Sequence, residues 1–241
     1  MKQGALFLMI LATTAFCAEP WKLSLELKGS LAFSHYSNDW AEEDAEGALT
    51  WVARLDAGAE KQIGSKLNSR TILKLEFGQT KAPGEVPVKS SDAIELESVL
   101  KATLGGWVDP FISARGESRF VDKTHPHERY VNPVKVSEAL GAARTLWKTD
   151  AVVWDVRLGA AAKQGIDRWQ PANDWETVVT SDGGIELVTE LNAVLPKEVV
   201  KLKSVLRVYE ALLRADSDTI PDSWRYPDVN WETTLGLTVV K

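Results

Sequence analysis

Residues 21–28 read Trp21-Lys22-Leu23-Ser24-Leu25-Glu26-Leu27-Lys28, in which apolar side chains alternate with charged or hydroxyl side chains. Successive side chains of a β-strand point to opposite faces of a sheet, so this stretch predicts a strand with one apolar and one polar face. The alternation recurs in later segments, namely residues 49–57, 71–77, 94–104, 108–119, 136–147, 152–163, 185–195, 200–212 and 229–239. We therefore expect an all-β fold of about 10 antiparallel strands.

The links between these segments alternate between long and short. The long links are rich in Asn, Asp, Pro and Ser and contain residues 37–44, 81–92, 122–133, 167–175 and 216–228. The short links are residues 64–66, 105–106, 148–150 and 196–198. Long loops at one end and tight turns at the other are typical of an up-and-down antiparallel barrel. Because no shift in composition marks a boundary, we expect a single β-barrel domain over residues 19–241.

Residues 1–18 have the layout of a secretory signal peptide. Lys2 precedes the apolar run of residues 5–12, and small residues follow at Ala15 and Cys17. We expect cleavage after Cys17, with cleavage after Ala18 as the alternative. Acylation of Cys17 is less favoured, since the bulky Phe16 directly precedes it. The protein is therefore expected to be exported. No later apolar run approaches the roughly 20 residues of a membrane helix, so any membrane crossing must use strands.

An alternating pattern does not by itself say which face points outward. A soluble barrel places its apolar side chains inside, whereas an outer-membrane barrel turns them toward lipid and its charges toward the lumen. Three features favour the membrane: segments of about ten residues, which suffice to cross a bilayer on a tilt, mid-strand charges of both signs, and the alternation of long and short links. We expect a transmembrane barrel in the cell outer membrane that serves as a small pore, a transport component or a structural and surface-interaction scaffold, with lipid and the barrel-assembly machinery as its partners. The alternative is a soluble periplasmic barrel that binds a small apolar ligand.

The polar faces of the segments supply the candidate lumenal charges. They are Arg54, Asp56, Lys74, Glu76, Glu95, Glu97, Lys101, Asp109, Arg115, Glu117, Asp155, Arg157, Glu186, Glu190, Lys201 and Arg207. A barrel of ten strands has a narrow interior that side chains largely fill. We therefore expect these groups mainly to form a network of ion pairs, with selection of ions or a polar path as the other role.

Tryptophan is unusually common, with ten residues against six Phe and four Tyr. Six tryptophans fall in or at the ends of predicted strands: Trp21, Trp51, Trp107, Trp147, Trp154 and Trp231. Amphipathic rings of this kind collect at membrane interfaces, so these six are the candidate aromatic girdle. The other four lie in or beside long links, where we expect the outer rim: Trp40, Trp169, Trp175 and Trp224.

Composition and motifs exclude several classes of function. An isoelectric point near 5.3 and a net charge of -6 argue against nucleic acid as a partner, because phosphate binding needs a basic face. A single cysteine excludes an intramolecular disulfide and a cysteine-rich metal site. No P-loop, dinucleotide fingerprint or nucleophile elbow occurs. We expect no enzymatic activity and no cofactor.

The remaining polar groups that could carry chemistry lie in the links. His125 and His127 form a histidine pair, and two acidic groups could hold cations: residues 42–44, and the four aspartates of the last link, Asp216, Asp218, Asp222 and Asp228. Neither acidic group has the spacing of a calcium loop, and two histidines in a loop are usually solvated. His35 beside Ser34 and Ser37 is weak evidence for a catalytic pair. We expect no metal site.

Four short stretches carry a resemblance to a known family. They are Ser37-Asn38-Asp39-Trp40, Leu73-Lys74-Leu75-Glu76-Phe77-Gly78-Gln79-Thr80, Asp92-Ala93-Ile94-Glu95-Leu96-Glu97 and Val229-Asn230-Trp231-Glu232-Thr233-Thr234-Leu235. The chain resembles an uncharacterised bacterial family of predicted outer-membrane β-barrel proteins, a domain of unknown function. The resemblance implies a location and a fold and no activity. Such proteins continue for about another hairpin and end on an aromatic residue, whereas this sequence ends at Lys241. Either the barrel closes with 10 strands, or the sequence is truncated and the full barrel has 12.

Overall fold

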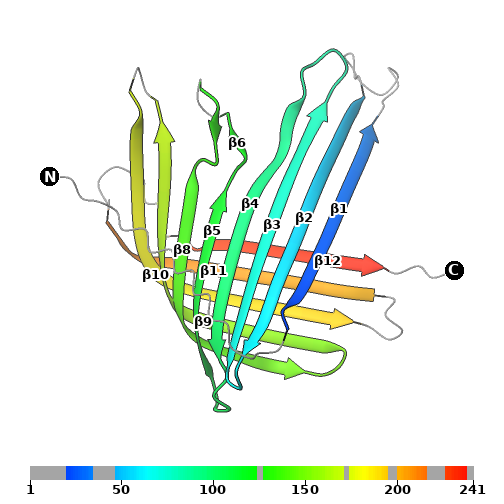
Figure 1. Ribbon diagram of the computed structural model, residues 1–241. Coiled ribbons are helices and arrows are strands. Elements are labelled where there is room, and N and C mark those ends of the chain that lie inside the picture. Colours follow the sequence, from blue (N-terminus) through cyan, green and yellow to red (C-terminus); the bar gives the residue numbers. More distant parts are fainter. Residues whose placement is uncertain are drawn as a thin grey trace.

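All the regular structure among the described residues of the computed structural model is β-strand (Figure 1). The structure describes residues 20–34, 47–123, 127–170, 174–194, 200–215 and 226–237. The strands are β1 (Lys22–Ser34), β2 (Ala48–Ile63), β3 (Leu67–Lys81), β4 (Val88–Ala102), β5 (Asp109–Ser118), β6 (Val121–Asp122), β7 (Arg129–Tyr130), β8 (Val134–Lys148), β9 (Val152–Trp169), β10 (Glu176–Val194), β11 (Val200–Arg214) and β12 (Asp228–Leu237). No helix among the described residues is long and apolar enough to cross a membrane.

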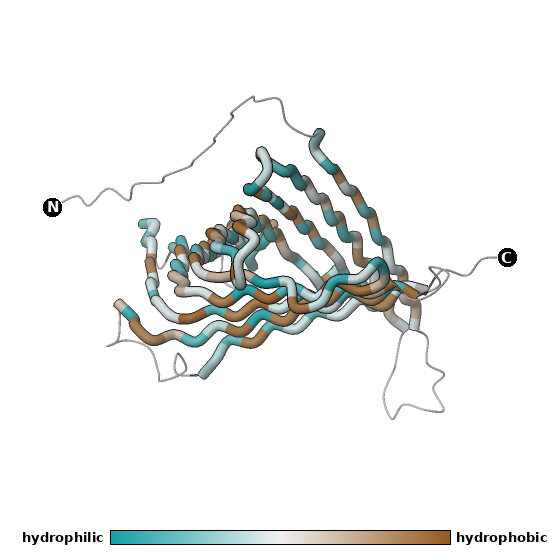
Figure 2. The backbone as a smooth tube through the Cα atoms, turned by 90° about the horizontal axis from the view of Figure 1, so that it is seen from below, coloured by the Kyte–Doolittle hydropathy of each residue, from teal (hydrophilic) through white to brown (hydrophobic). Residues whose placement is uncertain are grey.

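Ten of these strands form one antiparallel sheet in chain order, β1-β2-β3-β4-β5-β8-β9-β10-β11-β12. The two remaining strands, β6 and β7, pair as a small separate hairpin in the third long link. Seen from below, the sheet curls around an open interior (Figure 2). The expected all-β antiparallel fold is confirmed. Among the described ladders none joins β1 to β12, so the sheet is an open, curled half-barrel.

Most strands extend beyond the segments that alternation marks, and β10 differs most. The sequence predicts a strand from residue 185 and a link before it, whereas β10 begins at Glu176. Its first half pairs with β9 from Glu176↔Trp169 to Gly184↔Ala161. This half contains Thr180, Ser181 and two glycines where an alternating strand would have apolar residues. Its pairing with β9, and not an apolar face of its own, therefore holds it in the sheet.

Three strands, β8, β9 and β10, bend strongly along their length, so that β11 and β12 cross the first five strands at a steep angle (Figure 1). In the register of β8 and β9, Gly141 lies opposite Gly159. A Cβ atom on Gly141 would lie 2.2 Å from the Leu158 carbonyl oxygen, and one on Gly159 would lie 2.4 Å from that of Leu140. Glycine therefore permits the close backbone approach of β8 and β9 at this pair.

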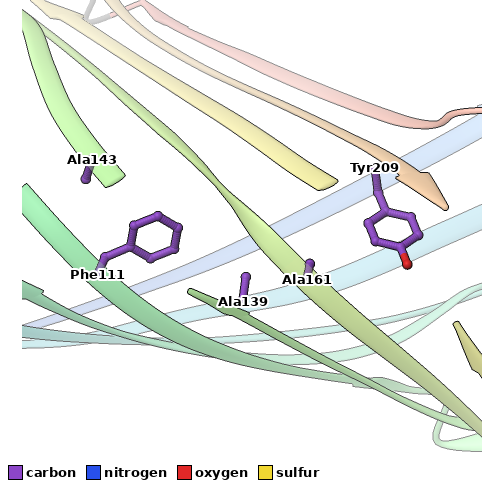
Figure 3. Close-up of a cluster of buried hydrophobic side chains, with 5 residues drawn as sticks. All are labelled: Phe111, Ala139, Ala143, Ala161 and Tyr209. Carbon is purple, nitrogen blue, oxygen red and sulfur yellow. The ribbon is translucent and has the colours of Figure 1, made fainter. Parts of the chain in front are cut away.

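Apolar side chains contribute little to the concave side of the sheet. One buried cluster consists of Phe111, Ala139, Ala143, Ala161 and Tyr209, from β5, β8, β9 and β11 (Figure 3). Three of its five members are alanines, so the cluster buries little area. The concave interior also holds the buried Val188 and many charged side chains.

Candidate functional site: the charged interior

Glu97 on β4 is the centre of a belt of ion pairs that crosses the interior. Its carboxylate accepts hydrogen bonds from Arg157 on β9 at 2.8 Å and from Arg207 on β11 at 2.9 Å. These strands are not neighbours in the sheet. The side chains of Glu97 and both arginines are 17% exposed or less. Removing one partner of such a buried group leaves an uncompensated charge, so the belt couples opposite walls of the fold.

Glu190 on β10 makes a second crossing. Its carboxylate contacts Arg70 on β3 at 2.8 Å and Arg157 at 3.2 Å. Arg157 therefore bridges Glu97 and Glu190. Both carboxylates are held by two cations each.

Glu232 on β12 makes a third crossing. Its carboxylate lies 2.8 Å from Lys74 on β3 and 3.9 Å from Arg54 on β2. The last strand thus reaches across to the second and third strands through side chains, although no ladder joins the two edges of the sheet. Further pairs extend the belt along the walls: Lys28–Asp56, Arg54–Asp56, Arg54–Glu76, Lys74–Glu95, Arg115–Glu95, Arg115–Glu117 and Arg207–Glu186.

Twelve of the sixteen predicted lumenal charges take part in these ion pairs. The other four are Lys101, Asp109, Asp155 and Lys201. Asp109 accepts a hydrogen bond from the Leu104 backbone N–H in a turn, and Asp155 accepts one from Thr145. Lys101 and Lys201 form no ion pair within the described part of the chain.

Sequence reasoning did not select three members of the belt, Lys28, Arg70 and Glu232. Lys28 and Glu232 occupy polar positions of the alternating pattern and could have been chosen on that ground. Arg70 lies just before the segment that alternation marks, yet it shares the face of Lys74 and Glu76 at a spacing of two. Extending the pattern toward the turn would have found it.

A cavity of about 640 Å³ lies in the interior between β1–β4 and β10–β12, from the ion-pair belt toward the tight turns. Nine cationic side chains line it: Lys22, Lys28, Arg54, Arg70, Lys74, Arg115, Lys201, Lys203 and Arg207. Seven anionic side chains line it: Glu26, Asp56, Glu60, Glu95, Glu97, Glu190 and Glu232. Nine against seven leaves an excess of two positive charges in a chain whose net charge is -6. The cavity is therefore more positive than the protein as a whole.

The opposite, convex face of the sheet is apolar and exposed. Along β1, Leu23, Leu25, Leu27, Leu31 and Phe33 are each 74–76% exposed. Leu158 on β9 is also exposed, while the outward positions Leu55, Leu75 and Leu206 are half-buried between neighbouring strands. Among the described residues, thirty-five large hydrophobic side chains are exposed and only six hydrophobic side chains are buried. This is the reverse of the usual arrangement in a soluble domain.

The tryptophans lie near the two ends of the strands. Near the tight turns are Trp21, Trp107, Trp147 and Trp154, and near the long links are Trp51, Trp231 and Trp175. All seven are exposed. Lys61 lies over the Trp21 ring at 5.2 Å, and Arg144 lies over that of Trp107 at 4.9 Å. Trp40, Trp224 and the side chain of Trp169 lie outside the described residues.

The third long link is anchored by a buried ion pair that the sequence does not reveal. Arg129 on β7 contacts Asp122 on β6, and both side chains are almost fully buried. Arg129 also donates to Asp167 and to the Arg168 carbonyl, at 2.8 Å and 2.7 Å. The β6–β7 hairpin is thereby attached to the end of β9. At its tip, the exposed pair Lys123–Glu128 lowers the pKa of Glu128 through the hydrogen bond from Lys123.

Replacement of Arg129 by methionine is expected to release this hairpin. The substitution removes the cation that both Asp122 and Asp167 contact, and loss of one partner from a buried pair costs about 3 kcal/mol. Amide hydrogen exchange over residues 120–132 should accelerate, while exchange in β2 and β3 should stay unchanged. Equal exchange in the variant and the parent would contradict the anchoring role.

The other candidate groups do not form a site in the part of the chain that the structure describes. His127 is exposed, and His125 lies outside the described residues. Asp228 pairs with Lys163 at 2.8 Å, whereas Asp216, Asp218, Asp222, His35, Ser37 and residues 42–44 lie outside that part. No group of three or more His, Cys, Asp or Glu residues that could hold a metal ion occurs among the described residues.

Comparison with protein-family models, with curated proteins and with solved structures found no match to this chain. The resemblance to the uncharacterised outer-membrane family stays a prediction. Any function must therefore be argued from the geometry of the chain itself.

Proposed function

We propose that this protein is an integral outer-membrane β-barrel without enzymatic activity, and that it serves as a small pore or a component of a transport system. One observation carries the proposal, namely that the convex face is apolar and exposed while the concave face holds the ion pairs. Outer-membrane barrels have this arrangement, with an apolar band toward lipid and a polar interior. A soluble barrel with an apolar ligand cavity would have the opposite arrangement.

The lengths of the strands and the positions of the tryptophans also support a membrane location. The ten strands of the main sheet have 10 to 19 residues each, and a tilted strand needs about 9–11 to cross the hydrocarbon core. Exposed tryptophans near both strand ends suit the two interfaces of a bilayer. In a complete barrel β1 and β12 would pair with each other, since their directions in the sheet are antiparallel.

The interior supports a transport role over a purely structural one. The ion-pair belt crosses the middle of the interior, and the cavity opens between the belt and the tight turns. A packed scaffold has no need for a charged cavity of this size. The belt would act as the constriction and the cavity as a vestibule.

Replacement of Leu27 by arginine tests the membrane location. The side chain of Leu27 is 76% exposed on the convex face of β1, where lipid would contact it. A charge at the bilayer midplane costs about 2–4 kcal/mol, so the variant should fold into lipid vesicles less completely, as measured by heat-modifiable mobility on gels. The matched control is Ser30→Arg on the opposite face of the same strand, which should fold normally. Equal folding of both variants, or recovery of the parent protein in the soluble periplasmic fraction, would overturn the proposal.

Planar-bilayer recordings separate the pore from a closed scaffold. The proposal expects discrete single-channel currents from the refolded protein. Absence of current at every voltage would remove the pore function and leave a structural or surface role for the barrel.

A further inference from the structure

We infer that the cavity is a binding site for a small soluble oxyanion, of the class of orthophosphate and short carboxylates, with Lys203 as the central donor. This inference names the solute of the proposed transport function. It rests on the proposed function only in assuming that the solute passes through the barrel. The site centres on one row of side chains across β10, β11 and β12.

In the register of these strands, Lys203 is the partner of Asn192 on β10 and of Thr234 on β12. Side chains directly opposite each other on one face of an antiparallel pair are about 5 Å apart at Cβ. All three residues line the cavity. The row therefore presents an amide, an ammonium and a hydroxyl side by side, and each of them can donate a hydrogen bond.

No acceptor within the described residues occupies these donors. Lys203 forms no ion pair there, and neither Asn192 nor Thr234 forms a side-chain hydrogen bond. Lys201, two residues before Lys203 and on the same face, also lines the cavity without an ion pair, and its partner on β12 is Gly236. Gly236 has no side chain, and a Cβ atom there would meet only Lys201 within 4 Å, so there is space beside Lys201. The row thus combines unused positive charge, neutral donors and room for a solute.

Two carboxylates that follow this row in the register are already neutralised. One step toward the belt, Glu190 and Glu232 flank Val205 in the same register. Glu190 is held by Arg70 and Arg157, and Glu232 is held by Lys74 and Arg54. At this position an incoming anion therefore meets two carboxylates that are each paired with two cations, whereas Lys203 and Lys201 form no ion pair among the described residues. Charge-assisted hydrogen bonds from ammonium to phosphate or carboxylate oxygens are the contacts that such a site would make.

The test is titration of the refolded protein in neutral detergent micelles with orthophosphate at constant ionic strength. The apparent dissociation constant of orthophosphate is measured from the broadening of its phosphorus NMR line. The parent should bind phosphate saturably, and Lys203→Gln should weaken binding at least about tenfold, because the substitution removes the charge-assisted hydrogen bond from the ammonium group. The matched control is Lys61→Gln, which removes the same charge from the side chain lying over the Trp21 ring, and it should bind as the parent does. Lys203→Arg should retain binding.

Several outcomes would overturn the inference. They are no saturable binding by a folded parent, equal weakening in the Lys203 and Lys61 variants, and binding of a short-chain anionic phospholipid with no binding of orthophosphate. The micelle measurement does not need conduction, so it separates the two proposals. Phosphate binding without current would remove the pore and keep the site, whereas current without phosphate binding would remove the site and keep the pore.

Discussion

Replacement of Glu97 by glutamine is expected to lower the free energy of unfolding by about 3 kcal/mol. Glutamine has nearly the same shape but no charge, so Arg157 and Arg207 lose the carboxylate that both contact at 2.8–2.9 Å. Each arginine keeps one other carboxylate, Glu190 or Glu186 respectively, which places the cost at the lower end of the range for buried pairs. Urea unfolding in detergent micelles, followed by tryptophan fluorescence, measures the change.

The matched control for this substitution is Glu60→Gln. Glu60 lines the same cavity, but its carboxylate accepts a hydrogen bond only from the Asn68 side chain, so we expect a change within about 1 kcal/mol. If Glu97→Gln and Glu60→Gln unfolded at the same urea concentration, the belt would not be the element that couples the walls of the fold.

The ion-pair belt joins residues that are far apart in the sequence. The sequence therefore indicates which strand faces are charged but not which charges pair. Alternation with period two correctly predicted an all-β antiparallel fold, and it placed charges such as Glu97 and Arg157 on the polar faces of the predicted strands. It could not pair these two residues, which are 60 positions apart, nor Lys74 with Glu232, which are 158 apart. Those pairs depend on the curl of the sheet, and curl is a property of all the strands together.

Two further parts of the fold lack a signal in the sequence. The β6–β7 hairpin has strands of two residues each, too short for any period, and its position depends on the Arg129 contacts with β9. The first half of β10 lacks apolar alternation and exists because β9 extends far enough to pair with it. In both cases a neighbouring strand supplies the stability that the local residues do not.

The Gly141–Gly159 pair of β8 and β9 is the subject of the second large prediction. Replacement of Gly159 by alanine is expected to lower the free energy of unfolding by about 3 kcal/mol, at the upper end of the usual cost of overpacking. The added Cβ atom would lie 2.4 Å from the Leu140 carbonyl oxygen and 3.2 Å from the Phe111 ring. Backbone atoms cannot rotate away as a flexible side chain can. Relief of the clash therefore requires β8 and β9 to separate at the Gly141–Gly159 pair.

Gly116 on β5 supplies the comparison that isolates this effect. A Cβ atom at Gly116 would meet nothing within 4 Å, so Gly116→Ala should change the free energy of unfolding by no more than about 0.5 kcal/mol. Both substitutions add the same methyl group to a strand glycine, so their intrinsic effects on the unfolded chain cancel. The difference between the two variants in urea unfolding thus reports the backbone approach alone. If Gly159→Ala were as stable as Gly116→Ala, the close backbone contact between β8 and β9 at Gly159 would not limit the stability of the sheet.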